Sequence, residues 1–284
     1  MFSKEKVEEI ITATLVADSY SLVSHWVYDA QQLEELDVNW EELNAPCAKF
    51  HKGKMAGDFT HIGDQEYWLK EFLKDKDVFD EVQYLRYWQE KMSNYEGYFD
   101  GATKETLENI KNGKFIGSNS EDFSVIGRIT PLLLVSKNEN EFIKNVQSFI
   151  RLSHNSDKVV GAATFFAQLL FRVQDGQNIK KEILSLKDDF NRFVVQSVQD
   201  GVASKKEETS LTLRKFGLAC GINQGFSGII HLLCKYPNNL KELLVENAKA
   251  GGDTSSRAMV ATMIIVANSS SEGIPENWFH INKK

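Results

Sequence analysis

The sequence predicts an all-α protein in which many helices pack around a shared core. Only 4 prolines occur among the 284 residues, so few positions would break a helix. Apolar residues recur at steps of three, four and seven along most of the chain, which is the spacing of one face of an α-helix. Strict alternation of polar and apolar residues is rare, so no sizeable sheet is expected.

The expected helices follow apolar stripes along the chain. The stripes are formed by Val7, Ile11, Leu15 and Leu22; by Phe142, Val146, Phe149 and Ile150; by Val159, Ala163, Phe166, Leu170 and Val173, stopped by Gly176; by Leu240, Leu243, Leu244 and Ala248; and by Met259, Met263 and Val266. The chain shows no proline- or serine-rich linker and no shift in composition. Residues 1–284 are therefore expected to form one domain of roughly ten or more helices.

Composition narrows the class of protein. The chain carries 33 Lys and Arg against 40 Asp and Glu, a net charge of −7, which argues against a nucleic-acid partner because phosphate recognition needs clustered basic residues. No run approaches the roughly 18 apolar residues of a membrane span, and the charged start MFSKEKVEEI has no secretory character. Three cysteines without a CxxC pair argue against disulfides or structural zinc, so a cytoplasmic location is expected.

The first polar break in the helical pattern is Asp18, which falls on the apolar stripe of the N-terminal helix. A carboxylate there must be hydrogen-bonded, paired or protonated, because an isolated buried charge is costly. Two interpretations stay open: a satisfied core aspartate bonded to a neighbouring helix end, and a site residue. Downstream, SHWVYD places His25 either in packing at a helix end or in the wall of a site for a planar ligand.

The second break is the glycine-rich segment HKGKMAGDFTHIGDQEYWL at residues 51–69. Asp64 is predicted to be the N-cap of the helix that follows. A cap does not explain Thr60 and His61, and loops dense in Gly, Asp, Thr and His let a ligand approach closely.

Two further segments point to ligand contacts less specifically. In FIGSNSEDFSVIGRITPL, Ser118 or Ser120 is predicted to cap a short helix that begins at Glu121, where free N–H groups could bind a diphosphate. In RLSHNSDK, His154 lies at the junction of two helices, either as a capping residue or as a ligand contact.

The last break is GGDTSSRAM, where Asp253 follows two glycines and precedes an apolar helix. Asp253 is predicted to cap that helix. Together with Ser255 and Ser256, it also gathers oxygens of the kind that Mg²⁺ accepts as ligands.

In this order, these segments resemble the ADP-ribosylglycohydrolases and the J1-type crystallins along almost the whole chain. TATLVADSYSLVSHW resembles the family's first helix, GDFTHIGDQ lies where the family has a Thr-Asp-Asp loop, and GSNSEDFSVIGRITPL resembles the segment that meets the diphosphate of ADP-ribose. LSHNSD resembles the Thr-His segment that follows. The most specific match is AKAGGDTSSRAMVATMIIVANSSSEGIPENW, which is similar to the family's Gly-Gly-Asp-Thr-Asp-Thr block ending in Ile-Pro-x-x-Trp.

The resemblance implies a single orthogonal multi-helix bundle that hydrolyses an N- or O-glycosidic bond of an ADP-ribose-like substrate. It also implies two Mg²⁺ ions, for which the matching ligands here are Thr60, Asp253 and Ser256. The two carboxylates after Thr60 are replaced by His61 and Ile62, and the second Asp of the last block is a serine. With three of the four family carboxylates absent, a tight binuclear Mg²⁺ centre is not expected.

The expected site residues divide by role. Asp18, Asp64 and Asp253 are the expected acid, base or water-positioning groups, and His61 is expected to polarise a group or shuttle a proton near neutral pH. Substrate contacts are expected from His25, Thr60, Ser118, Asn119 and His154. The expected partner is a small molecule or an ADP-ribosylated substrate. Two alternatives stay open: a module that binds ADP-ribose or a nucleotide without turnover, and a crystallin-like structural protein.

Overall fold

The all-α prediction is confirmed by the computed structural model, which describes residues 1–35 and 37–283. The α-helices are α1 (Lys4–Ser21), α2 (Ala30–Glu35), α3 (His61–Leu73), α4 (Glu81–Ser93), α5 (Gly101–Lys111), α6 (Ser124–Gly127), α7 (Glu139–Ser153), α8 (Asp157–Arg172), α9 (Ile179–Leu186), α10 (Arg192–Ala203), α11 (Thr209–Phe216), α12 (Ile222–Lys235), α13 (Leu240–Ala250) and α14 (Thr254–Asn268). Short 3-10 turns are η1 (Lys49–His51), η2 (Thr130–Val135), η3 (Gln174–Gly176), η4 (Lys187–Asp189) and η5 (Glu276–Phe279). In the described part of the chain, extended pairing is limited to isolated bridges, Ser118 with His154 and Asp122 with Gly221.

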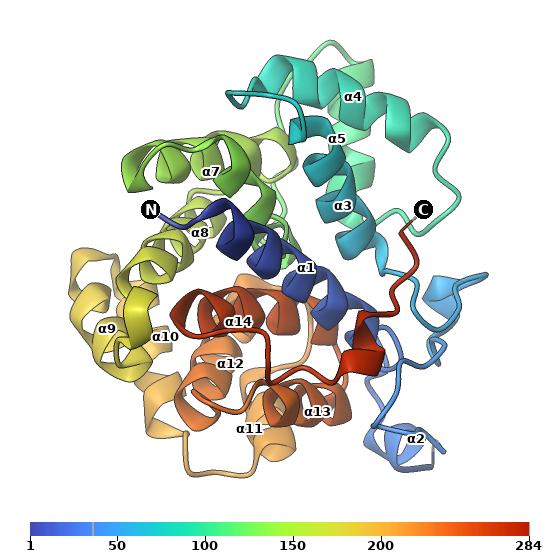
Figure 1. Cartoon of the computed structure of the whole chain (residues 1–284). Coiled ribbons are helices and arrows are strands. Elements are labelled where there is room, and N and C mark those ends of the chain that lie inside the picture. The colour runs from blue at the N-terminus through green and yellow to red at the C-terminus, as the bar shows by residue number, and fades with distance from the viewer. Residues whose placement is uncertain (36, 284) are drawn as a thin grey trace.

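The first and last long helices form the centre of the molecule. In Figure 1, α1 crosses the middle and α14 runs beside it, so the two ends of the chain share one core. Every residue from Thr254 to Ala267 is buried. A helix that is buried on all sides needs a mostly apolar sequence, and the segment MVATMIIVA of α14 has one.

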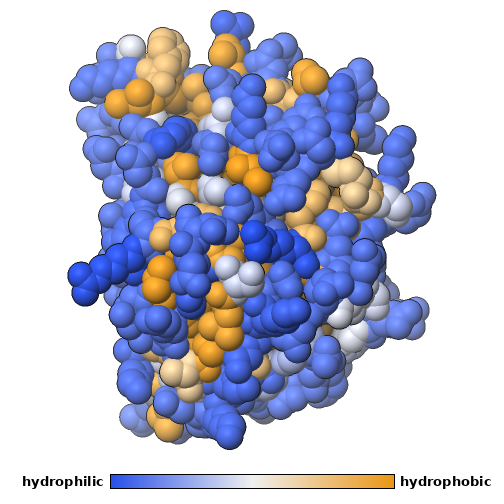
Figure 2. Space-filling view, turned by 90° about the vertical axis from the view of Figure 1, so that its left-hand side faces the viewer, coloured by the Kyte–Doolittle hydropathy of each residue, from blue (hydrophilic) through white to orange (hydrophobic). Residues whose placement is uncertain are grey.

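The remaining helices surround this pair. Helix α7 packs on α8, α10 packs on α12, and α3 packs against η2 and α1. The face opposite the C-terminus is mostly hydrophilic, with small hydrophobic patches broken by polar residues (Figure 2). Among the described helices, none combines the length and apolar character needed to cross a bilayer.

The helix ends test three sequence predictions. Asp253 is the N-cap of α14, as predicted. Asp64 is not a cap, because α3 begins three residues earlier and Thr60 caps it. The helix predicted from Glu121 begins instead at Ser124, because residues 121–123 pair with residues 220–222 through backbone hydrogen bonds. Neither Ser118 nor Ser120 therefore caps it.

The C-terminal segment ties distant parts of the chain together. Trp278 is fully buried and stacks on Tyr20 of α1, with ring centroids 3.8 Å apart. Its Nε1 donates to the carbonyl of Glu41 at 2.9 Å. Farther along, the backbone N–H of Asn282 donates to the carbonyl of Gly57 at 2.7 Å. The last residues thus hold the loop between α2 and α3 against the core.

Candidate functional site

Asp18 joins the starts of α3 and α14 to the end of α1. Its Oδ2 accepts from the backbone N–H of Thr60 at 2.8 Å, and its Oδ1 accepts from Thr60 Oγ1 at 2.6 Å and from Ser255 Oγ. Burial raises the pKa of Asp18, although these three donors act in the opposite direction. Both oxygens are occupied within the protein, which favours the core-aspartate interpretation and makes Asp18 a positioning residue.

Gly63 allows this junction to close. A Cβ at Gly63 would overlap Asp18 Oδ2 and lie 2.5 Å from Asp18 Cγ. Any side chain at this turn of α3 would therefore displace the carboxylate.

Asp253 differs from Asp18 because half of its carboxylate is unused. Its Oδ1 accepts from Ser256 Oγ at 2.7 Å and from the Ser256 N–H at 3.3 Å. Its Oδ2 is buried without a hydrogen-bond partner. Burial raises the pKa of Asp253, which is fully enclosed. A buried oxygen without a donor is costly and marks a position suited to a ligand or a metal.

Three imidazoles gather next to Asp253. His25 Nδ1 lies 3.5 Å from Asp253 Oδ1, and the His25 ring centroid lies 5.2 Å from that of His51 and 6.0 Å from that of His61. Trp26 covers them, with centroid distances of 5.5 Å to His51 and 4.9 Å to His61. Burial lowers the pKa of His25 well below its ordinary value and that of His51 to about 3, so both rings are neutral at physiological pH.

His61 forms a dyad with Asp100. Its Nε2 lies 3.3 Å from Asp100 Oδ2, while Asp100 Oδ1 caps α5 by accepting from the Thr103 N–H at 2.6 Å. Although burial alone raises it, contacts with His61 and Arg128 hold the pKa of Asp100 below its usual range. Nε2 is the ring nitrogen that faces this carboxylate, and the other ring nitrogen, Nδ1, is buried without a hydrogen-bond partner.

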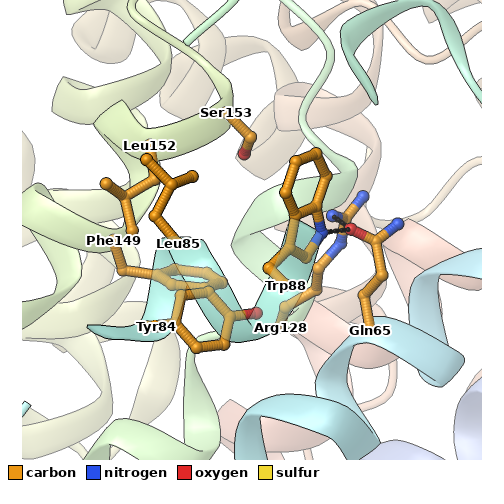
Figure 3. Close-up of a pocket in the computed structure, with 8 residues that line it drawn as sticks. All are labelled: Gln65, Tyr84, Leu85, Trp88, Arg128, Phe149, Leu152 and Ser153. Atoms are coloured by element: carbon orange, nitrogen blue, oxygen red, sulfur yellow. Dashed lines mark hydrogen bonds between the residues drawn. The ribbon is translucent and has the colours of Figure 1, made fainter. Parts of the chain in front are cut away.

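Arg128 supports the dyad from behind. Its Nη2 lies 3.7 Å from Asp100 Oδ2, and its Nη1 donates to Gln65 Oε1 at 2.6 Å. Trp88 Nε1 donates to the same oxygen at 2.9 Å, so both side chains point at Gln65 (Figure 3). These hydrogen bonds fix the guanidinium and hence the carboxylate that orients His61.

His61 lines an open cavity of about 210 Å³. The cavity lies between the loop after η1 and the loop before α5. Its lining residues are Phe50, His51, Lys52, Lys54, His61, Glu96, Gly97 and Tyr98. Drug-sized ligands fill pockets of about 300–1,000 Å³, so this cavity has room for a sugar-sized group, with the rest of a larger substrate outside.

Asp64 lies on the next turn of α3 but is already paired. Its Oδ2 accepts from Lys54 Nζ and from the Tyr95 hydroxyl, both at 2.6 Å. Burial raises its pKa, while Lys54 and Tyr95 act to lower it. This arrangement favours a structural role for Asp64 and fixes Lys54 at the cavity.

The two segments expected to contact a diphosphate are largely engaged with each other. Ser118 is buried and donates through Oγ to the carbonyl of Ser153 at 2.7 Å. His154 is the C-cap residue of α7, and burial lowers its pKa to about 3. Its Nδ1 lies 2.9 Å from Ser153 Oγ. Asn119 is exposed and bonds Glu105.

Sequence reasoning missed Asp100 and Arg128. Asp100 precedes GATKETLENI as an ordinary helix cap, and that cap signal was the only local indication of it. Arg128 lies within a segment singled out for other residues. Their joint role depends on α5 and α6 meeting α3, which local sequence does not specify.

The oxygens present do not fit the two Mg²⁺ ions that the family resemblance implies. Thr60 Oγ1 already donates to Asp18 and accepts from the Ile62 N–H, and Ser256 Oγ donates to Asp253. One free carboxylate oxygen, on Asp253, remains in this ligand set. Mg²⁺ gives up its water reluctantly and requires more oxygens than this.

Comparisons with known proteins agree with this architecture. The chain matches the ADP-ribosylglycohydrolase family over residues 2–282. It is 23% identical to crystallin J1A and 22% identical to crystallin J1B, both of Tripedalia cystophora, covering 97% of this chain and 91% of each relative. A solved ADP-ribosylglycohydrolase-related protein complex contains a chain of the same fold, with a TM-score of 0.71 and 17% identity over 96% of this chain and 90% of that one. With a family match that spans nearly every residue, the chain belongs to the ADP-ribosylglycohydrolase family.

Proposed function

We propose that this protein hydrolyses an N- or O-glycosidic bond of an ADP-ribose-like substrate, with the His61–Asp100 dyad as its proton-transfer group. The observation that carries the proposal is the free Nδ1 of His61, at a residue that lines the 210 Å³ cavity and is oriented by a buried carboxylate. An imidazole held in one tautomer by a carboxylate is a common arrangement for general acid–base catalysis.

The neighbouring groups supply the other requirements of the reaction. Nδ1 of His61 accepts a proton from the attacking water. The transition state of glycosidic cleavage carries positive charge on the sugar, which nearby anions stabilise. Glu96 lines the cavity and provides such a carboxylate. Lys52 and Lys54 line the cavity and provide positive charge for a phosphate outside it.

A direct test measures release of ADP-ribose from peptides ADP-ribosylated on arginine or on serine. We expect wild-type protein to release it and His61→Gln to do so at least ~100-fold more slowly, the loss typical of a removed general base. His280→Gln is the matched control, because His280 is exposed and far along the chain from the dyad. Absence of release from both peptides, with and without added Mg²⁺ or Zn²⁺, would remove the hydrolase proposal.

Binding without turnover is the second candidate. It is favoured by the internal hydrogen bonds that already occupy Asp18, Thr60 and Ser256. Calorimetry with free ADP-ribose separates the two candidates: saturable heat from a protein that releases nothing supports the binding module. No heat and no release together leave the crystallin-like structural role.

A further inference from the structure

Asp122, Cys220 and Asp253 form a cluster beside the dyad that the proposed reaction does not use as a unit. Each offers one ligand atom, and these atoms all lie within 4.8 Å of one another. Asp253 is buried, whereas Asp122 and Cys220 are partly exposed. A path for an ion from solvent therefore passes these two side chains.

Backbone hydrogen bonds fix the three segments together. The N–H of Phe123 donates to the carbonyl of Cys220 at 3.0 Å, which sets Asp122 against the 217–221 loop. The N–H of Asp253 donates to the carbonyl of Leu218 at 2.8 Å. Gly252, at φ 69°, lets this approach occur, because a Cβ there would lie 2.5 Å from the Leu218 Cβ. The cluster is thus held by the fold rather than by flexible side chains.

The cluster also has an unused buried hydrogen-bond acceptor. Asp253 Oδ2 has no hydrogen-bond partner, while Oδ1 is occupied by Ser256. The nearby Arg257 is directed elsewhere, donating to Asn247 Oδ1 at 2.8 Å and to the Gly251 carbonyl at 2.6 Å. Arg257 therefore leaves this buried oxygen available to a divalent ion.

We propose that Asp122, Cys220 and Asp253 form a binding site for a thiophilic divalent ion, Zn²⁺ in the first instance. Tetrahedral zinc places a thiolate and carboxylate oxygens about 3.5 Å apart, from bond lengths of about 2.3 and 2.1 Å, so small side-chain movements close the cluster on an ion. A thiolate ligand selects zinc over magnesium. The three protein ligands leave a fourth position for water, as in catalytic zinc sites.

The absence of a CxxC pair argued against structural zinc, because these three ligands come from segments far apart in the chain. His25 contacts the proposed ligand Asp253 rather than the ion itself. Its Nδ1 lies 3.5 Å from Asp253 Oδ1 and accepts from the Ser255 N–H at 3.3 Å. Metal binding releases the Cys220 proton, so affinity rises with pH.

Cobalt(II) titration of the chelator-treated full-length protein tests the site without any activity measurement. We expect a near-ultraviolet thiolate-to-cobalt charge-transfer band that Zn²⁺ abolishes by competition and Mg²⁺ does not. Cys220→Ser should remove the band, and Asp122→Asn should weaken Co²⁺ binding at least tenfold. Cys47→Ser is the matched control and should keep the band, since Cys47 lies outside the cluster.

The result that overturns the site is a protein without the band, or a band unchanged by Cys220→Ser. Circular dichroism of each variant checks that it is folded, and Zn²⁺ should raise the melting temperature of Cys47→Ser but not of Cys220→Ser. His61→Gln should bind Co²⁺ like the wild type. Loss of activity in that variant and loss of metal in Cys220→Ser therefore report on separate proposals.

Discussion

Glu66 is a carboxyl group enclosed at the centre of the molecule, one turn beyond His61 on α3. It is fully buried, and its Oε1 accepts from Thr14 Oγ1 at 2.7 Å and from Thr130 Oγ1 at 2.5 Å. Its Oε2 has no partner. Burial raises its pKa from 4.5 to about 8, so the folded protein holds this group protonated at neutral pH.

This shift predicts a pH-dependent difference between wild type and Glu66→Gln. The pKa of Glu66 is higher in the folded state than in the unfolded state. Its protonated form therefore contributes fully to the free energy of unfolding below pH 4.5, and this contribution is lost as pH rises to about 8. Glutamine does not titrate. The wild type should therefore lose stability relative to Glu66→Gln between these values, by up to about 1.4 kcal/mol per pH unit. Urea unfolding of both proteins at pH 5 to 9 measures this, and parallel pH profiles would contradict it.

At the scale of an element, α3 is set by contacts that override helix propensity. Asp18 receives three hydrogen bonds directly against Gly63, so it has no free direction in which to move. Propensity alone favours alanine over glycine inside a helix by about 1 kcal/mol. At Gly63 the Asp18 carboxylate occupies the space that an alanine side chain would need.

Gly63→Ala is therefore expected to lower the free energy of unfolding by about 1–3 kcal/mol, the usual cost of overpacking. Gly161→Ala is the matched control, because Gly161 lies inside α8 and a Cβ there meets nothing closer than Asn191 Nδ2 at 4.0 Å. That control should gain about 1 kcal/mol from propensity. Chemical denaturation measures both, and equal gains would show that α3 has room at Gly63.

The same elements show what local sequence can and cannot predict. Stripes such as Phe142, Val146 and Phe149 predicted α7 correctly, because burial of one face imposes a period of 3.6. The start of α3 was misplaced because both Thr60 and Asp64 are good capping types, and tertiary contact with Asp18 decides between them. His61 was expected as a site residue, but its partner Asp100 comes from a different helix and carried only the signal of a cap.

On the scale of the whole molecule, the C-terminal segment is expected to stabilise the cavity at a distance. Trp278 packs on Tyr20 and donates a hydrogen bond to Glu41, while Asn282 donates one to Gly57. The loop from Glu41 to Gly57 is therefore attached at both ends. That loop carries Phe50, His51, Lys52 and Lys54 of the cavity lining.

Trp278→Ala should cost about 3–5 kcal/mol of stability, as for other buried aromatic residues. It should also increase hydrogen exchange across residues 41–58 more than across α8. Phe115→Ala is the control, since Phe115 is 75% exposed and its loss should change stability by no more than about 0.5 kcal/mol. Exchange in residues 41–58 that stays at the wild-type rate would show that the loop is held independently.

The pairing of α1 with α14 also has a consequence for how the protein is made. Helix α1 ends at Ser21, whereas its main packing partner α14 begins at Thr254, so the ribosome completes α1 long before α14. Contacts between such distant segments slow folding, and the waiting apolar surface favours aggregation. A nascent chain of this protein should therefore depend on chaperones until α14 emerges, and a product terminated before α14 should be a substrate for proteolytic quality control.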